Sequence, residues 1–379
     1  MSKKVFLGMS GGVDSSVSAL LLRDQGYDVT GIYMKNWSED LPGMHCPWAE
    51  DLADAKRVAT SLDLDFEVWD FEADYKTRVV DYMLSEFQKG HTPNPDVVCN
   101  ELVKFKLFYD RAIERGADYI ATGHYARAED ASLLRAVDEN KDQTYFLYRM
   151  SDEATARTLF PIGHLTKPEV KKIAAERGLD VATKKESMGI CFVGEVGIKD
   201  FLSNYLKTIP GEIREVETDQ ILGYHDGAIF YTIGQRHGLY LGGGLPYYVV
   251  KKDLSKNLVY VSRDLNHPEL WADQLALTDL HLRNGRTLAD LAKIPDLTVR
   301  LRHRGELLPA TARVVETNTR GDQCSCEEHK DSGQRPGASS SKNIGLLAIT
   351  FANPVKRPAS GQSAVLYAGE VCLGGGYIA

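Results

Sequence analysis

The most chemically distinctive residue of the chain is Cys99. It ends the proline-containing stretch 90–99, GHTPNPDVVC, and precedes residues 101–115, whose apolar spacing predicts a helix. A helix dipole stabilises a thiolate at the helix N-terminus, and Lys104 and Lys106 act in the same direction. The pattern predicts a nucleophilic thiol, and the alternative is an inert cysteine buried in a strand–helix connection.

A second cysteine, Cys191, lies in the segment 184–192, KKESMGICF. Two lysines upstream of it, Lys184 and Lys185, indicate an electropositive loop, which also favours a thiolate. When one cysteine carries a persulfide, the other thiolate can attack it and form a disulfide, which releases a sulfide equivalent. Together with Cys99, this segment therefore predicts sulfur chemistry.

Residues 8–16, GMSGGVDSS, combine the groups that bind phosphate. They follow the apolar run 5–7 and begin a stretch in which Val13, Val17 and Leu20 recur at helical spacing. Glycines bring backbone N–H groups close to a ligand, and a helix start adds unpaired donors and a positive dipole end. The order S-G-G-x-D-S-S resembles the pyrophosphate loop of ATP-pyrophosphatases, which cleave ATP between its α and β phosphates. A serine-capped strand–helix corner is the alternative.

The composition is that of a globular protein. A chain of 379 residues is too long for one ordinary core, and no apolar run is long enough to cross a membrane. Residues 1–4 lead directly into a predicted strand, which leaves no room for a signal peptide, so we expect a cytoplasmic protein. The six cysteines are too scattered for a disulfide framework, and the net charge of −8 argues against binding of polyanions over the whole surface.

The first 125 residues alternate predicted strands with predicted helices. Besides 5–7, the strands are 28–34, 66–69 and 119–122, and the helices that follow the first are 50–62, 75–88 and 101–115. This alternation predicts an α/β fold with a doubly wound parallel sheet. Such a sheet binds its ligand beyond the carboxyl ends of its strands, where residues 8–16, Met34 and Gly123 fall.

The pattern changes after residue 150. The predicted helices there are 153–159, 167–176 and 198–205, and the predicted strands are 221–224, 229–232, 247–251, 259–262, 298–302, 312–315, 346–351, 364–367 and 370–373. The later strands predict a small barrel. We expect a nucleotide-binding domain over 1–150, a central domain over 151–270 and a C-terminal β-barrel over 271–379.

Residues 317–343 interrupt the predicted barrel without a single large apolar side chain. They include Cys324, Cys326 and His329, but three ligands spaced so tightly do not match the paired spacing of zinc sites. We expect a hairpin insertion without an assigned function.

Two basic stretches stand out in this acidic chain. One contains Arg283, Arg286, Lys293, Arg300, Arg302, Arg304 and Arg313, and the other contains Lys167, Lys171, Lys172, Arg177, Lys184 and Lys185. On a barrel the first would form a surface for a phosphate backbone, and the second would hold a nucleic acid beside Cys191. A solvated charged face is the alternative for both.

Ten segments that run through most of the chain carry a resemblance to one family. They are SGGVDSS (10–16), YMKNW (33–37), EDLADAKRVATSLDL (50–64), GHTPNPDVVCN (90–100), KF (104–105), ADYIATGHYAR (117–127), DQTYFL (142–147), FPIGHLTKPEV (160–170), KKESMGICF (184–192) and YTIGQRHGL (231–239). Together they resemble the tRNA-specific 2-thiouridylases, which convert the wobble uridine of certain tRNAs to 2-thiouridine.

The resemblance implies an N-terminal ATP-pyrophosphatase domain, a central domain and a C-terminal β-barrel. It implies that Cys99 is the nucleophile and that Cys191 carries the persulfide. The implied ATP contacts are Gly8, Met9, Ser10, Gly11, Gly12, Val13, Asp14, Ser15, Met34 and Gly123. The residues implied to border the target base or contact tRNA are Asn94, Pro95, Asp96, His124, Gln143, Thr144, Tyr145, Arg302, His303 and Gln362.

The expected reaction follows from the chemistry of uracil, whose 2-carbonyl oxygen is a poor leaving group. ATP would adenylate this oxygen and release pyrophosphate, with Mg²⁺ stabilising the charge and Asp14 as its candidate ligand. A persulfide on Cys191 would then supply sulfur, directly or as sulfide released by Cys99. The target base must leave its stack, and the expected partners are tRNA and a persulfide donor, either a cysteine desulfurase or a relay protein, with no membrane.

Two other functions stay open from the sequence alone. An ATP-pyrophosphatase that aminates a small molecule would explain residues 10–16 but neither cysteine segment. An RNA-binding module gated by ATP would use the same groove without forming AMP.

Overall fold

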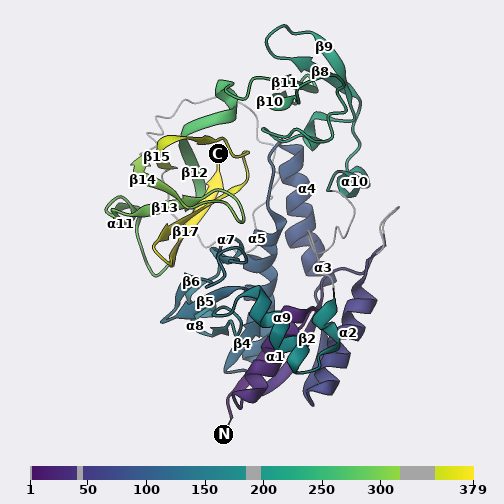
Figure 1. Cartoon of the computed structure of the whole chain (residues 1–379), viewed down its shortest axis with the longest axis vertical. Coiled ribbons are helices and arrows are strands. Elements are labelled where there is room, and N and C mark those ends of the chain that lie inside the picture. Colours follow the sequence, from purple (N-terminus) through teal and green to yellow (C-terminus); the bar gives the residue numbers. More distant parts are fainter. Residues whose placement is uncertain (1, 41–45, 185–197, 316–345) are drawn as a thin grey trace, which may run out of the picture.

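The computed structural model describes residues 2–40, 46–184, 198–315 and 346–379. Figure 1 shows three parts: a sheet wrapped by helices near the N-terminus, a small β region at the far end of α4, and a barrel that contains the C-terminus. Among the described residues, no helix has the length and apolar character needed to span a membrane.

The first part is built on a five-stranded sheet in which every pairing is parallel. Its strand order is β3 (Asp65–Asp70), β2 (Asp28–Lys35), β1 (Lys4–Gly8), β4 (Tyr119–Thr122) and β7 (Thr158–Leu159). Phe6 of β1 lies in one apolar cluster, whereas Val5 and Leu7 lie in another, because alternate side chains point to opposite faces. The predicted doubly wound sheet is confirmed.

Each face of this sheet has its own helices. Buried residues of α1 (Val13–Asp24), α2 (Trp48–Ser61) and α9 (Lys167–Glu176) share the cluster that contains Val5. The opposite cluster takes side chains from α3 (Glu72–Tyr75), the π-helix η1 (Lys76–Val80), α4 (Asp81–Gln88), α5 (Pro95–Cys99), the π-helix η2 (Asn100–Phe108), α6 (Tyr109–Glu114), α7 (Thr144–Leu147) and α8 (Asp152–Ala156).

Some predicted boundaries near this sheet are wrong. The helix predicted over 153–159 ends at Ala156, and Thr158 and Leu159 instead form β7, which pairs with β4. β7 is a strand of the first sheet and α9 packs in the cluster on one of its faces, so the first part extends past residue 150. The 3-10 helix η3 (Asp180–Thr183) follows α9 on the same side.

The central part is a four-stranded sheet in the order β10 (Tyr248–Asp253), β11 (Leu258–Ser262), β8 (Gly211–Glu215) and β9 (Ile221–His225). It follows α10 (Ile198–Ser203). The strand predicted over 229–232 is wrong, because residues 228–230 form the 3-10 helix η4 (Ala228–Phe230). Ala228 and Tyr231 are buried in the core of the central part. Their apolar side chains explain why the sequence pattern resembled that of a strand.

The C-terminal part is a closed barrel of six strands. Around the barrel these are β12 (Trp271–Leu282), β15 (Leu346–Lys356), β14 (Leu308–Val315), β13 (Leu297–Arg300), β16 (Ser363–Ala368) and β17 (Val371–Ile378), and β17 pairs with β12. The short η5 (Pro268–Leu270) leads into it and α11 (Leu288–Leu291) packs on its core. The predicted barrel is confirmed, and the insertion 317–343 with Cys324 and Cys326 lies outside the described residues.

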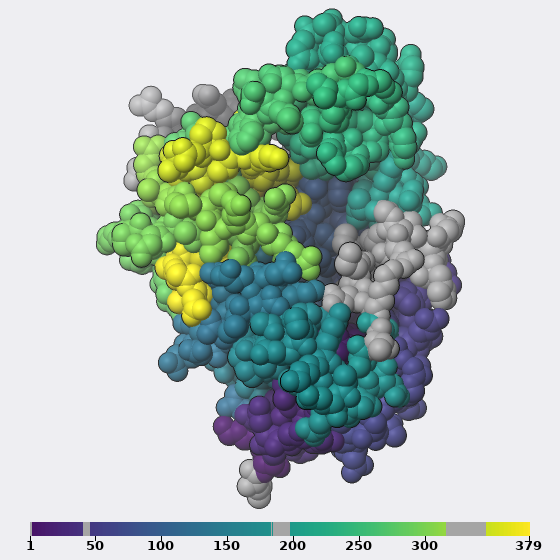
Figure 2. Space-filling view, viewed as in Figure 1, coloured from purple at the N-terminus to yellow at the C-terminus, as the bar shows by residue number. Residues whose placement is uncertain are grey.

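A hairpin from the first part extends the barrel sheet. β5 (Ala126–Glu129) and β6 (Ser132–Arg135), which were not predicted, join it through a pairing of Leu134 with Val371. The first part and the barrel therefore share one sheet edge. Figure 2 shows a hollow between the barrel and the central part, with residues of the first part at its floor.

Candidate active site

The loop between β1 and α1 is fixed by contacts that only glycine permits. Gly11 has a φ of +73°, and a Cβ built on it would lie 2.3 Å from the carbonyl oxygen of Asp51. Gly12 is the N-cap of α1, and the first amides of a helix have no partner within it. The loop thus combines a tight turn with the donors of a helix start, which suits a phosphate ligand.

Serine side chains brace this loop from within. The Ser10 amide donates to Ser15 Oγ at 3.2 Å, and Ser15 Oγ donates to the Gly12 carbonyl at 3.1 Å. The Met9 amide donates to the Ile32 carbonyl at 2.8 Å, which joins the loop to β2. Ser10 is exposed while Ser15 is buried, so of these two serines Ser10 is the one accessible to a ligand.

The ends of three strands meet at this loop. A Cβ on Gly123, which follows β4, would lie 2.7 Å from the Ser15 nitrogen, and a Cβ on Gly8 would lie 2.8 Å from Met34 Cε at the end of β2. The strand order reverses between β1 and β4, and ligands of doubly wound sheets bind at such a point. The structure therefore brings the predicted ATP residues from 8 to 15 together with Met34 and Gly123.

Asp14 has partners that the sequence analysis did not assign. Lys167 Nζ lies 2.7 and 2.8 Å from its two carboxylate oxygens, and the Tyr125 hydroxyl donates to Oδ1 at 2.9 Å. Lys167 is buried at the first turn of α9. The segment 160–170 contributed to the resemblance, but only the fold shows that its lysine reaches the glycine loop.

Lys184 joins the glycine loop to the segment that contains Cys191. Its Nζ lies 3.3 Å from the Gly11 carbonyl, 2.8 Å from Asp51 Oδ1 and 2.5 Å from Asp54 Oδ2. Burial lowers the pKa of this lysine, but the two carboxylates outweigh it and the pKa is raised. Lys184 is therefore charged and connects the start of this segment to Gly11 and to α2. Cys191 itself, in the segment 185–197, lies outside the described residues.

The prediction that Cys99 lies at a helix N-terminus is wrong. The helix begins earlier, at Pro95, and the Asn94 side chain caps it by accepting from the Asp96 amide at 3.1 Å. Proline suits the first helical turn because its φ is already helical and it lacks the N–H that would be unpaired. Cys99 is the last residue of α5, so the positive end of the dipole falls on residues 94–96 instead.

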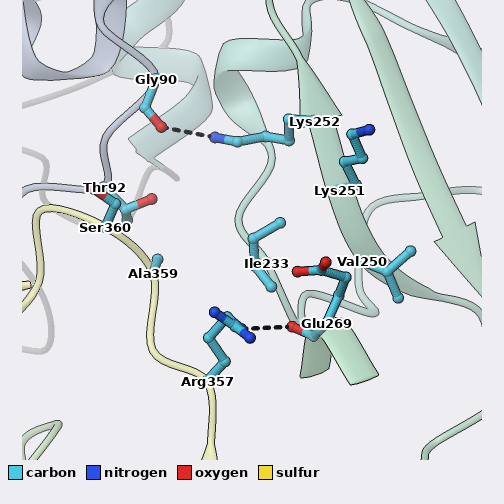
Figure 3. Close-up of a pocket in the computed structure, with 10 residues that line it drawn as sticks. All are labelled: Gly90, Thr92, Ile233, Val250, Lys251, Lys252, Glu269, Arg357, Ala359 and Ser360. Carbon is cyan, nitrogen blue, oxygen red and sulfur yellow. Dashed lines mark hydrogen bonds between the residues drawn. The ribbon is translucent and has the colours of Figure 1, made fainter. Parts of the chain in front are cut away.

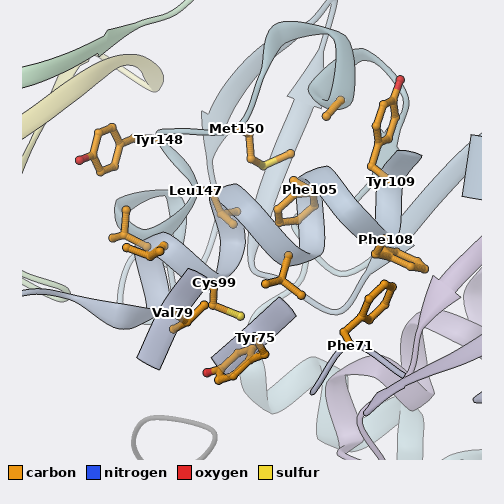
Figure 4. Packing of buried hydrophobic residues seen from close by; sticks show 14 of the residues in the cluster. Phe71, Tyr75, Val79, Cys99, Phe105, Phe108, Tyr109, Leu147, Tyr148 and Met150 are labelled. Carbon is orange, nitrogen blue, oxygen red and sulfur yellow. The ribbon is translucent and has the colours of Figure 1, made fainter. Parts of the chain in front are cut away.

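Cys99 is buried, with 3% of its surface exposed. Figure 4 shows it in an apolar cluster with Tyr75, Val79 and Leu147. The chain continues from it into η2, where Phe105 has non-helical angles of φ −103° and ψ 16°. Irregular π turns of this kind are frequent at functional sites and give a helix a place to rearrange.

Asp96 and His124 are partly buried, and the charge of Lys104 lowers the pKa of both side chains. Burial raises the pKa of Asp96, while Lys104 opposes that rise. Burial also lowers the pKa of His124 well below its usual value, and Lys104 adds to this effect. His124 Nδ1 lies 2.9 Å from Thr122 Oγ1. The imidazole of His124 is therefore uncharged at neutral pH.

The predicted tRNA residues of α7 are held against the barrel. Thr144 and Tyr145 are 0% and 1% exposed, and the Tyr145 hydroxyl donates to the Ser363 carbonyl at 3.1 Å. The Gln143 side chain accepts from the Tyr125 amide at 2.8 Å. Beside them, Arg300 and Asp142 form a buried ion pair. Contact of these residues with tRNA stays a prediction, and in this structure they join two parts of the chain.

The three predicted tRNA residues of the barrel differ in exposure. Arg302 is exposed, whereas the ring of His303 lies 4.7 Å from that of Phe146. Burial lowers the pKa of His303 to about 4. The Gln362 side chain donates to the Thr92 carbonyl at 2.7 Å, so it contacts the segment that leads to Asn94.

Three family models match the chain in succession. The model described as tRNA methyl transferase HUP domain matches residues 3–195, the tRNA methyl transferase PRC-barrel domain matches 199–263, and the aminomethyltransferase beta-barrel domain matches 322–378. The three matches follow the order of the sheet, the central part and the barrel.

Curated relatives match over nearly the whole chain. A tRNA-specific 2-thiouridylase MnmA of Shewanella amazonensis is 44% identical, with 100% of this chain and 94% of the relative aligned. One of Listeria welshimeri is 43% identical over 99% of this chain and 94% of the relative. A solved 4-thiouridine synthetase–RNA complex with bound ATP is 17% identical, covers 53% of this chain and 50% of its own, and has a TM-score of 0.33, a likeness too weak to carry an argument.

Proposed function

The chain belongs to the tRNA-specific 2-thiouridylase family, a family of sulfurtransferases, and we propose that it uses ATP to replace the 2-oxygen of the wobble uridine of tRNA with sulfur. The observation that carries this proposal is Lys184, which joins the beginning of the Cys191 segment to the Gly11 carbonyl. A sulfur-bearing segment that starts at a phosphate-binding loop couples activation of the base to delivery of sulfur.

ATP would bind with its phosphates at the loop from Gly8 to Ser15 and its nucleoside near Met34 and Gly123. The Cβ distances at Gly8, Gly11 and Gly123 support this, since each glycine allows backbone to lie where a larger residue would intrude. The amides of the α1 start and the exposed Ser10 would hold the leaving pyrophosphate.

No group of three His, Cys, Asp or Glu side chains that could hold a metal occurs within the described ranges. Mg²⁺ bound mainly by phosphates needs only one or two protein carboxylates, and Asp14 is the carboxylate in the loop, so the site fits that mode. The ion would supply charge neutralisation at the phosphates. Lys167 would hold the Asp14 carboxylate in place, because it contacts both of its oxygens.

The target base would enter beside Asn94, Pro95 and Asp96. In the first step, uracil O2 forms a bond to the α-phosphorus of ATP and the bond to the β-phosphate oxygen breaks. Asp96 would accept the N3 proton of the base, since it is the carboxylate next to Asn94 and Pro95 and burial raises its pKa. His124 would act as an uncharged hydrogen-bonding group.

In the second step, sulfur would replace the oxygen at C2 and AMP would leave with that oxygen. In the direct route the outer sulfur of a Cys191 persulfide attacks C2, and the Cys99 thiolate then attacks Cys191 Sγ and frees the thiolated base. In the other route Cys99 attacks first and the released sulfide attacks C2. When the Cys99 thiolate attacks Cys191 Sγ, a disulfide forms, and a dithiol reductant must then restore both thiols. Because Cys99 is 3% exposed, this attack requires the α5–η2 segment to open. The sulfur donor would be a cysteine desulfurase or a relay protein, acting where the chain is made, in the cytoplasm.

The test is a thiolation assay with purified protein, ATP, unmodified tRNA and a donor carrying radioactive sulfur. We expect one 2-thiouridine and one AMP per turnover, and we expect Cys99→Ser and Cys191→Ser to abolish thiolation while tRNA binding is kept. Cys46→Ser is the matched control, since Cys46 is a buried free cysteine of the same apolar cluster. Full activity of either active-site variant would contradict the two-cysteine scheme, and AMP formation without 2-thiouridine would favour transfer of a group other than sulfur.

A further inference from the structure

All three parts of the chain meet at one pocket, drawn in Figure 3. Its volume is about 280 Å³. Gly90 and Thr92 line it from the first part, Lys252 from β10, and Arg357 and Ser360 from the loop after β15. Gly90 and Thr92 directly precede the residues proposed to border the target base.

In the part of the chain that the structure describes, two cationic side chains of the pocket, Lys252 and Arg357, form hydrogen bonds only to neutral carbonyl oxygens. Lys252 Nζ donates to the Gly90 carbonyl at 3.0 Å, and across the described residues no carboxylate lies within ion-pairing distance of it. Arg357 donates to the carbonyls of Glu269 at 3.1 Å and Trp271 at 3.0 Å. Hydrogen bonds to carbonyls leave the charge of both side chains uncompensated, and such a pair is suited to bind an anion.

The remaining charged groups around the pocket are Lys251 and Glu269. Lys251 is exposed and its Nζ lies 5.7 Å from the centre of the Tyr260 ring. Burial lowers the pKa of Lys252 to about 8, as expected for an amine that has left water without gaining a counter-ion. A bound anion would reverse this effect and favour the charged amine.

The wall of the pocket also holds the segment before the active site. The Thr92 amide donates to the Ser360 carbonyl at 2.8 Å, and Gln362 donates to the Thr92 carbonyl at 2.7 Å. Thr92 Oγ1 lies 3.3 Å from Thr232 Oγ1 of the motif YTIGQRHGL, to which the sequence analysis gave no role. The adjacent Ile233 lines the pocket. An occupant would therefore contact the residues that position Asn94.

We propose that this pocket binds the ribose-phosphate backbone of the tRNA, with Lys252 and Arg357 as its phosphate-binding cations. The Glu269 carboxylate would repel an isolated phosphate, but it can accept a hydrogen bond from the neighbouring ribose 2′-hydroxyl, which distinguishes RNA from DNA. In Figure 1, α1, which begins at the proposed ATP loop, lies beyond the α3 end of α4, whereas Gly90 follows the opposite end of α4. We therefore expect the phosphates of ATP not to reach this pocket. The identity of the RNA rests on the proposed function.

The direct test is the salt dependence of tRNA binding, measured without ATP or sulfur donor by fluorescence anisotropy over a range of NaCl concentrations. Arg357→Gln and Lys252→Gln should each weaken binding about tenfold at physiological salt and lower the slope of log K against log salt by about one. Lys256→Gln is the control, since Lys256 is an exposed lysine of the same hairpin, paired with Asp253 at 3.9 Å. Slopes for both pocket variants equal to that of the control would overturn the proposal.

Ethylation of single phosphates locates the contact. At one backbone position, ethylation of the phosphate should weaken binding to the unaltered protein. The same ethylation should not weaken binding to Arg357→Gln further, because that variant already lacks the contact. Ethylation effects that stay the same in this variant would overturn the proposal. Glu269→Gln should reduce the preference for RNA over the deoxy form at the adjoining ribose.

A third measurement separates binding from a merely structural role of Lys252. The pKa of Lys252, followed by NMR of methyl-labelled lysines, should rise when tRNA binds, and a value that stays near its unbound one would overturn the proposal. All of these readouts concern binding. A protein that binds RNA in this way but forms no 2-thiouridine would refute the proposed function and leave the pocket assignment standing.

Discussion

The β1–α1 loop and the segment from Gly90 to Cys99 are held in different ways. The loop is fixed by neighbours within the first part, among them Asp51 of α2 and Gly123 after β4. The segment is fixed by Lys252 of the central part and by Ser360 and Gln362 of the barrel. The comparison teaches that the proposed nucleotide site is complete within one part, whereas the proposed thiol site depends on all three.

The largest effect is expected for Gly11→Ala. The new Cβ would lie 2.3 Å from the Asp51 carbonyl at a φ of +73°, so the loop must move. ATP affinity, measured by calorimetry, should fall about 100-fold, a loss of about 3 kcal/mol. Gly26→Ala is the control, because Gly26 has a φ of +83° but nothing within 4 Å of the added atom. Equal ATP affinity for the two variants would show that the loop does not bind the nucleotide.

Lys167→Met should have the next largest effect, and again on the nucleotide side. It leaves the Asp14 carboxylate, 32% exposed, with no cation in the position that Lys167 now fills. We expect a loss of about 1–3 kcal/mol in the free energy of unfolding, less than for a fully buried pair because solvent screens Asp14, and AMP formation reduced at least tenfold. Adding Asp14→Asn to the Lys167→Met variant should restore most of the stability, measured by denaturant unfolding. If stability is not restored, the loss in Lys167→Met does not come from the unpaired Asp14 carboxylate.

Gln362→Ala tests the other side of the comparison. It removes the 2.7 Å hydrogen bond to the Thr92 carbonyl, worth about 1 kcal/mol, and so loosens the segment before Asn94. Thiolation should fall about tenfold while ATP affinity stays unchanged. Gln274→Ala, which removes a bond between neighbouring barrel strands, should leave both unchanged. A parallel loss of ATP affinity in Gln362→Ala would mean that the two sites are not held separately.

The last prediction concerns the pH dependence of stability and the contact between α7 and the barrel, and it changes neither proposed site. Burial lowers the pKa of His303 to about 4, against 6.5 for the free side chain, so between these values the unfolded chain binds a proton that the folded one does not. Stability should therefore fall as pH drops from 6.5 to 4, by up to about 2 kcal/mol after allowance for partial exposure. His303→Gln should flatten this part of the unfolding curve, and an unchanged pH dependence would contradict the assignment.

The parts that the sequence predicts well are those specified by neighbouring residues. The glycine loop, strand 119–122 and helix 167–176 occur as predicted, because apolar periodicity, glycine placement and the cap at Thr166 are local signals. Where two local signals competed, the prediction failed. Pro95 after Asn94 is itself a helix start, so Cys99 lies one turn inside a helical stretch that continues into η2, and not before its first residue.

The parts that the sequence does not predict join residues far apart in the chain. Lys167 reaches Asp14, and Gln362 reaches Thr92, with no pattern in either segment that names its partner. The hairpin of β5 and β6 was missed because its strands have four residues each and turn at Asp130 and Ala131, which have positive φ without a glycine. Such contacts are products of the tertiary fold.

The shared edge between β6 and β17 has a consequence for how the protein is made. On the ribosome, β5 and β6 are synthesised long before β17. Until β17 is made, the edge of β6 that will pair with it stays unpaired. Pairings between segments so distant in the chain form slowly, and unpaired edges invite association with other nascent chains. We expect the barrel to be the last part to assemble, and its arrival to convert an aggregation-prone intermediate into the finished enzyme.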